Sequence, residues 1–238
     1  MRQLNSCTDA GLARSTGLAW LATVVIGALA AVLLGKGIDI NLSADVQSVA
    51  TAMLDAESRL RALAWVGLLV FALDLYVSVG LYQLLKTSGI VLAGWSLALR
   101  ITAGLLSALG SVYLMNAAEI ASRPAYQALA EHSDRLLLNS LQATTSYTSF
   151  HLSLVLSSVA LAGFYRLFLT SERIPKPIAA WGLFASLFVA VAIVLRDFVP
   201  AVGHNAVTAA FMLSNLIALL STSAYLVLWG VRAERQRP

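Results

Sequence analysis

Charged residues are scarce in this chain. They make up 12% of its 238 residues, whereas hydrophobic residues make up 59%. A soluble globular domain usually carries about 25% charged residues, and the mean hydropathy here is +0.79. A soluble core of this size cannot hide so much apolar surface, so we predict that lipid surrounds most of the chain.

Cysteine, lysine and histidine are also rare, which argues against several kinds of site. Cys7 is the only cysteine, so no disulfide can form within the chain. The lysines lie at the ends of apolar runs, where none can form the Schiff base of a retinal protein; they are Lys36, Lys86 and Lys176. The histidines do not show the matched depth on facing helices that a bis-histidine haem needs; they are His132, His151 and His204. We therefore predict no cofactor, although a bound lipid is compatible with the sequence.

Motifs of catalysis and of nucleic-acid binding are missing too. The sequence contains no HExxH, GxSxG or phosphate-loop pattern. The pI near 9.5 reflects Lys and Arg that are not interleaved with aromatic residues, and in a membrane protein such residues gather in cytoplasmic loops. No spacing of His, Asp and Glu indicates a metal site. We predict no catalytic residue, no metal ligand and no nucleic-acid partner.

Six apolar runs are each long enough to cross a bilayer. The predicted fold is an all-α polytopic membrane protein with six transmembrane helices in one domain, residues 1–238. The predicted spans are residues 17–34, 62–85, 90–114, 145–169, 178–195 and 206–231. Small residues at four-residue spacing mark two faces that another helix can approach closely. On these faces, Gly27/Ala31/Gly35 and Gly182/Ser186/Ala190, we expect another membrane subunit or a second copy of the chain, besides membrane lipids.

Two polar intervals separate the apolar runs on one side of the membrane. In the first, residues 37–59, Asn41 or Ser43 can cap a helix and Asp45 lies in its first turn. The apolar residues of that helix share one face, which predicts an amphipathic helix on the membrane surface. A lid over a cavity is the alternative. A second surface helix is predicted over Ala125 to Leu141.

A carboxylate lies near the middle of the second span, where it costs roughly 2.5–3.5 kcal/mol on insertion scales. Asp74 is 11 residues before Leu85, and Arg100 is 10 residues after Ile90. The short turn between these spans makes them antiparallel neighbours, so both charges lie about 15 Å from the same membrane face. The register predicts an ion pair, which either fixes helix packing or serves as a binding site.

Polar and small residues extend each partner of this pair along one helix face. Ser78 and Tyr82 follow Asp74, and Ser107 and Ser111 follow Arg100. The fourth span is polar in its first half. Both faces on the second and third spans are predicted to point inward. The candidate ligand-binding residues are therefore Asp74, Ser78, Tyr82, Arg100, Ser107, Thr148 and His151.

The distribution of Lys and Arg predicts the orientation. With six spans, the side of the two termini holds nine of these residues: Arg2, Arg14, Lys86, Arg166, Arg173, Lys176, Arg232, Arg235 and Arg237. The other side holds six: Lys36, Arg59, Arg61, Arg123, Arg135 and Arg196. Both termini are therefore predicted to be cytoplasmic, and both surface helices to lie on the non-cytoplasmic side.

Three short motifs resemble a bacterial membrane protein family catalogued as domain of unknown function 4386. They are Leu81-Tyr-Gln-Leu-Leu-Lys86 after Asp74, Leu99-Arg100, and Ser171-Glu-Arg-Ile-Pro-Lys176. The resemblance covers about residues 14–231 and implies six transmembrane helices, and we predict that the protein lies in the bacterial inner membrane. It carries Asp74 and Arg100 over as family-type polar positions and implies no activity. It also implies an acidic residue in the last span and a histidine early in the fourth, where this chain has Leu219 to Ser221 and Ser146-Tyr147.

Three functions follow as hypotheses. The absence of catalytic motifs favours an accessory or scaffold subunit of a larger membrane complex. The alternative is a binder or carrier of a lipid or small amphiphile through the Asp74/Arg100 seam. An intramembrane enzyme is the second alternative. It needs His or acidic groups that converge at one depth, and His151 beside Asp74 or His204 would favour it.

Overall fold

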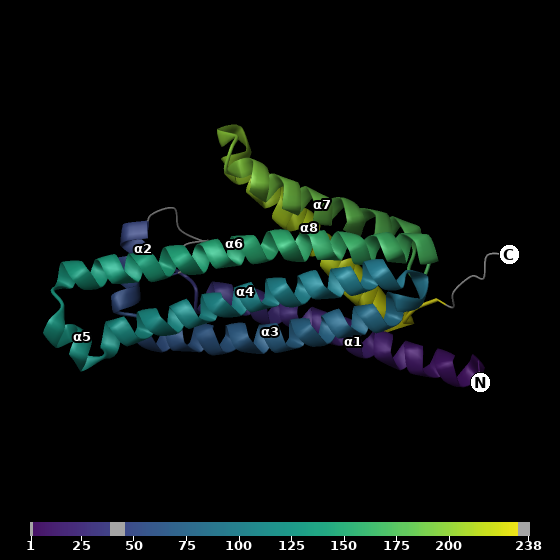
Figure 1. Cartoon of the computed structure of the whole chain (residues 1–238), viewed down its shortest axis with the longest axis horizontal. Coiled ribbons are helices and arrows are strands. Elements are labelled where there is room, and N and C mark those ends of the chain that lie inside the picture. Colours follow the sequence, from purple (N-terminus) through teal and green to yellow (C-terminus); the bar gives the residue numbers. More distant parts are fainter. Residues whose placement is uncertain (1, 39–45, 233–238) are drawn as a thin grey trace. The chain divides into compact units, whose positions relative to one another are not determined.

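A computed structural model describes residues 2–38 and 46–232 of the protein, and within them the fold is all-α without a strand. The helices are α1 (Arg2–Leu33), α2 (Val46–Leu54), α3 (Glu57–Leu85), α4 (Ile90–Ser122), α5 (Pro124–Leu129), α6 (His132–Ser171), α7 (Lys176–Arg196) and α8 (Asn205–Trp229). Two 3₁₀ turns, η1 (Lys86–Ser88) and η2 (Pro200–Gly203), join neighbouring helices (Figure 1).

Six of these helices are long and apolar enough to cross a membrane, which confirms the predicted fold class. They are α1, α3, α4, α6, α7 and α8. Three of them extend well beyond the predicted spans, because α1 begins at Arg2, α4 continues to Ser122 and α6 begins at His132. Hydropathy marks only the apolar part of a helix. The extensions of α4 and α6 contain no glycine and no proline, so these two helices continue into polar sequence.

The two polar intervals differ from prediction in their helix bounds. In the first interval α2 covers only Val46–Leu54, with Val49, Ala50 and Met53 buried. Its predicted capping residues, Asn41, Ser43 and Asp45, lie outside the described residues. The single helix predicted over Ala125 to Leu141 is wrong, because that segment is divided between α5 and the first turns of α6. A location of either segment on the membrane surface stays a prediction.

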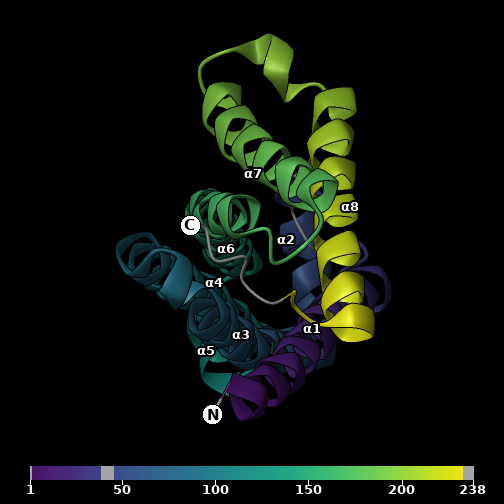
Figure 2. The same ribbon diagram turned by 90° about the vertical axis from the view of Figure 1, so that its right-hand side faces the viewer.

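Packing divides the chain into two compact units. The first unit comprises Met1–Val24, Leu73–Gly104 and Leu154–Pro238. Its core is centred on large side chains of α3 and α6 that are almost completely buried, including Leu81, Leu84, Phe164, Tyr165 and Phe168. Within this unit α7 and α8 lie side by side as a helical hairpin joined through η2 (Figure 2).

The second unit comprises Val25–Ala72 and Leu105–Ser153. The short helix α2 supplies much of its core, where Val49 and Met53 pack against Leu60 of α3 and Ala117 of α4. All four of these side chains are fully buried. The apolar face of α2 therefore packs against α3 and α4 within the unit.

Close helix contacts pair a glycine with a hydroxyl side chain. In the first unit a Cβ added to Gly80 would overlap Thr16, and one added to Gly163 would overlap Ser96. In the second unit Gly67 meets Ser111 in the same way. Lipid gives helices no hydrophobic reason to associate, so helices in membranes pack through such small residues.

One of the two predicted partner faces is occupied by the chain itself. A Cβ on Gly182 would overlap the ring of Tyr165, and Ser186 is 1% exposed. Ala190 is also buried. The prediction that Gly182/Ser186/Ala190 receives another subunit is therefore wrong, since four-residue spacing shows a close contact but not which helix makes it. On the other predicted face, nothing lies within 4 Å of a Cβ added to Gly27, but Gly35 is buried and a Cβ there would overlap the backbone of Ala31, so the prediction that Gly35 receives another helix is wrong.

We expect Gly182→Leu to lower the free energy of unfolding by about 1–3 kcal/mol, the usual cost of overpacking. The new side chain displaces Tyr165, whose hydroxyl lies 3.0 Å from Thr222 Oγ1. Thermal unfolding in a mild detergent measures the effect. Gly94→Leu is the matched control, because nothing lies within 4 Å of a Cβ there. Equal unfolding temperatures for the two variants would contradict this packing.

Candidate functional site

The mid-span charges form the predicted ion pair in the first unit. Arg100 Nη2 lies 2.8 Å from Asp74 Oδ1, joining α4 to α3. The guanidinium side chain is 6% exposed and the carboxylate side chain 35% exposed. The ion pair could be predicted from the sequence because the short connection through η1 fixes the register of two antiparallel helices.

Two serines complete the surroundings of Arg100. Its Nε donates to Ser78 Oγ at 3.2 Å, and its Nη1 donates to Ser157 Oγ at 2.6 Å. The Ser78 hydroxyl in turn donates to the backbone oxygen of Asp74 at 2.6 Å. Each nitrogen of the guanidinium therefore has a partner on α3 or α6, and we name these four residues the Arg100 clasp.

Ser157 is the residue of the Arg100 clasp that the sequence did not reveal. The sequence showed Ser157 and Ser158 in tandem, and the adjacent Ser158 lies on a polar face of α6 and is buried. A signal was nevertheless present, because a guanidinium has five N–H donors and one carboxylate cannot satisfy them all. A buried arginine therefore requires further acceptors on neighbouring helices.

Asp74 is only partly covered. It lies on the face of α3 that also carries the buried Val77 and Ser78, yet its side chain remains 35% exposed. One carboxylate oxygen bonds Arg100, and the other has no partner among the described residues. The acid thus presents a carboxylate oxygen that no described residue bonds.

The other predicted residues on α3 and α4 are divided between core and surface. Tyr82 is half-buried and packs against the core of the first unit. Ser107 is exposed, so the prediction that it points inward with Arg100 is wrong. Spacing shows that residues share a helix face, but a neighbouring helix need not cover that face along its whole length. Ser111, one turn further, is buried.

The two candidates on α6 belong to the second unit. Thr148 is exposed, and its hydroxyl donates to the backbone oxygen of Thr144 at 3.0 Å. His151 Nδ1 lies 2.9 Å from the backbone oxygen of Tyr147, and the two ring centroids are 4.0 Å apart. Hydroxyls that bond back to their own helix are common in transmembrane helices. Within the described residues no group of three His, Cys, Asp or Glu could hold a metal ion.

Comparison with known proteins gives one match. Residues 15–230 match the family described as a domain of unknown function, DUF4386. The chain belongs to this family. Curated proteins and solved structures gave no match.

The segment Ser171–Lys176, one of the three on which the resemblance rested, forms a structural anchor in the first unit. In the segment Ser171–Lys176, Ile174 is fully buried and Glu172 has a φ of 56°. Arg173 Nη2 donates to Thr87 Oγ1 at 2.9 Å, and the Arg173 backbone oxygen accepts from the backbone N–H of Arg232 at 2.9 Å. The motif therefore ties the α6–α7 turn to the α3–α4 turn and to the chain after α8.

We expect Asp74→Asn to destabilise the protein more than the double variant Asp74→Asn, Arg100→Gln does. The single change leaves a buried guanidinium without its counterion, which costs about 3 kcal/mol, whereas the double change leaves no buried charge. Thermal unfolding in detergent measures both. Asp197→Asn, at an exposed aspartate of the same unit, is the control. Equal losses in the single and double variants would argue against the pairing.

Proposed function

We propose that this DUF4386 protein is a non-catalytic accessory or scaffold subunit of a larger membrane complex. The observation that carries the proposal is the Arg100 clasp, in which every nitrogen of the guanidinium is bonded to α3 or α6. A guanidinium used in this way holds helices together and is not available to a substrate. The proposal thus assigns the mid-span charges a structural role.

The open face of α1 supports this proposal by offering a place for a partner helix. Gly27 has no atom within 4 Å of an added Cβ, and Ala31 one turn later is half-buried. Ala28, next to this face, is exposed, whereas the large exposed side chains Val25, Leu29 and Val32 lie on the opposite face of α1. Small residues let two helices approach closely in lipid. We therefore place the contact with another subunit, or with a second copy of the chain, on Gly27 and Ala31.

We further propose that the protein lies in the bacterial inner membrane with both termini in the cytoplasm. The proposal rests on the excess of Lys and Arg on the side of the termini.

A second candidate function is the binding of a lipid or small amphiphile at Asp74. It is favoured by the 35% exposure of the carboxylate, which leaves one oxygen able to accept a hydrogen bond from a ligand. The rest of the Arg100 clasp would then hold the acid in place, and Arg100 itself would not contact the ligand.

Native mass spectrometry of the protein purified from its own membrane in mild detergent separates the two functions. The accessory role predicts stoichiometric partner chains or a defined oligomer. Gly27→Leu should remove them, whereas Gly94→Leu, at another open glycine, should not. A lone chain carrying one non-protein mass that Asp74→Asn abolishes would instead establish the binder. A lone chain without any adduct would contradict both.

The single cysteine gives a direct test of orientation. We expect Cys7 to react with a membrane-impermeant maleimide in inverted vesicles and not in intact cells. A cysteine placed at Ser133, in the α6 extension predicted to be non-cytoplasmic, in a Cys7→Ser background should show the opposite pattern. Labelling of Cys7 in intact cells would reverse the proposed orientation.

A further inference from the structure

A pocket of about 370 Å³ lies in the second unit where α4, α5 and α6 meet. Its volume falls in the usual range for small-ligand pockets. Its lining mixes polar and apolar surface and comprises Asn116, Glu119, Arg123, Tyr126 and Gln142 together with Ile120 and Leu138. We infer that this pocket binds a zwitterionic phosphoester, a group that carries one phosphate and one primary ammonium, as phosphoethanolamine does.

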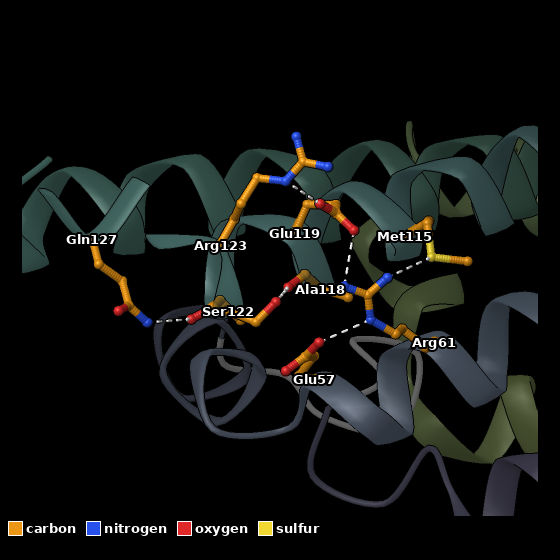
Figure 3. A network of polar contacts seen from close by, with 9 residues as sticks. Glu57, Arg61, Met115, Ala118, Glu119, Ser122, Arg123 and Gln127 are labelled. Atoms are coloured by element: carbon orange, nitrogen blue, oxygen red, sulfur yellow. Dashed lines mark hydrogen bonds and ion pairs between the residues drawn. The ribbon is translucent and has the colours of Figure 1, made fainter. Parts of the chain in front are cut away.

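Arg123 provides the phosphate contact. Its Nε lies 2.6 Å from Glu119 Oε2, the contact drawn as a dashed line in Figure 3, and the guanidinium ends in two further nitrogens. No described residue accepts a hydrogen bond from these nitrogens, and the side chain is 64% exposed. A guanidinium whose Nε contacts a carboxylate and whose two terminal nitrogens have no partner can donate two hydrogen bonds to one phosphate.

Glu119 holds Arg123 without adding a net negative charge to the pocket. Its other oxygen, Oε1, lies 2.8 Å from Arg61 Nη2, and Arg61 Nε lies 2.9 Å from Glu57 Oε1. Arg61 Nη1 also donates to the sulfur of Met115 at 3.7 Å (Figure 3). Two carboxylates and two guanidiniums therefore alternate in one network. A neutral network of this kind suits a ligand whose own charges cancel.

Gln142 of α6 also lines the pocket, and its buried side-chain oxygen lacks a hydrogen-bond donor among the described residues. A buried acceptor without a partner is unfavourable, and an ammonium N–H would satisfy it. Tyr126, 39% exposed, adds an aromatic ring that attracts a cation. Phosphate at Arg123 and ammonium at Gln142 thus define the two ends of the ligand.

The position of the pocket along α4 is compatible with a lipid headgroup. Helix α4 has 33 residues and is about 50 Å long, whereas the hydrocarbon core of a bilayer is about 30 Å thick. Asn116, Glu119 and Ile120 occupy its last two turns, and Arg123 follows directly. Ile120 and Leu138 offer apolar surface to glycerol or to the first methylene groups. The same chemistry also occurs in free phosphoethanolamine, so both sources are tested.

The test uses the purified full-length protein in mild detergent, titrated with short-chain phosphatidylethanolamine or phosphatidylcholine and followed by native mass spectrometry. The two lipids share the phosphate, but choline has no N–H donor for Gln142. We expect ethanolamine to bind about 10-fold more tightly than choline, the effect of one hydrogen bond to a charged group. Competition by free phosphoethanolamine would show that the headgroup suffices. Its absence, with lipid still bound, would assign the site to the lipid.

Two variants separate the roles of the pocket residues. Arg123→Gln should weaken both lipids about 10-fold or more, since it removes the phosphate fork. Gln142→Leu should weaken only the ethanolamine lipid and thereby abolish the preference. Arg166→Gln is the matched control, because it removes an exposed arginine of the first unit. It should change neither affinity.

Equal affinity of the wild-type protein for the two lipids would overturn the inference, as would an equal loss in Arg123→Gln and Arg166→Gln. If Gln142→Leu fails to fold, the comparison of the two lipids and the Arg123→Gln variant still test the inference. The site is independent of the proposed accessory role, since a partner subunit and a bound headgroup are seen as different masses in the same spectrum.

Discussion

The packing of the first unit depends on satisfying the guanidinium of Arg100. An unpaired charge at mid-span is among the costliest groups in a bilayer, and Arg100 is 7% exposed as a residue. Its partners come from two helices, with Asp74 and Ser78 on α3 and Ser157 on α6. These helices must therefore be in register with α4 for the charge to be tolerated. The fold of the first unit must therefore place α3, α4 and α6 so that Arg100 reaches all of its partners.

The remaining contacts reinforce that register without using charge. The ring of Tyr165 on α6 packs against Gly182 of α7, where a Cβ would overlap it. The Tyr165 hydroxyl reaches α8 and lies 3.0 Å from Thr222 Oγ1. Glycine and hydroxyl pairs bring other helices close in the same unit. Because neighbouring lipid is as apolar as the helices, shape and hydrogen bonds decide which helices meet.

The two units use arginine in opposite ways. Arg100 is buried and bonded at every nitrogen, whereas Arg123 is bonded at Nε alone and leaves its terminal nitrogens open. Because Arg100 is buried, no ligand reaches it, and it serves to hold helices together. Exposure beside a pocket makes Arg123 able to bind an anion. On α4, the guanidinium that a ligand can reach is therefore the one just after the end of the helix and not the one at its middle.

The sequence by itself determined the six spans, because hydropathy and length decide which segments cross a bilayer. It also determined the pairing of Asp74 with Arg100, since a short turn fixes the depth of both residues. The match of DUF4386 to residues 15–230 is likewise a property of the sequence alone.

Only the tertiary structure decided what each helix face meets. It placed Ser157 beside Arg100, left Ser107 exposed and filled the Gly182 face from within the chain. It also brought Gln142 to the same pocket as Arg123. Helical periodicity shows which residues share a face. Whether that face meets another helix, lipid or water depends on neighbours far away in the sequence, whose packing no local pattern encodes.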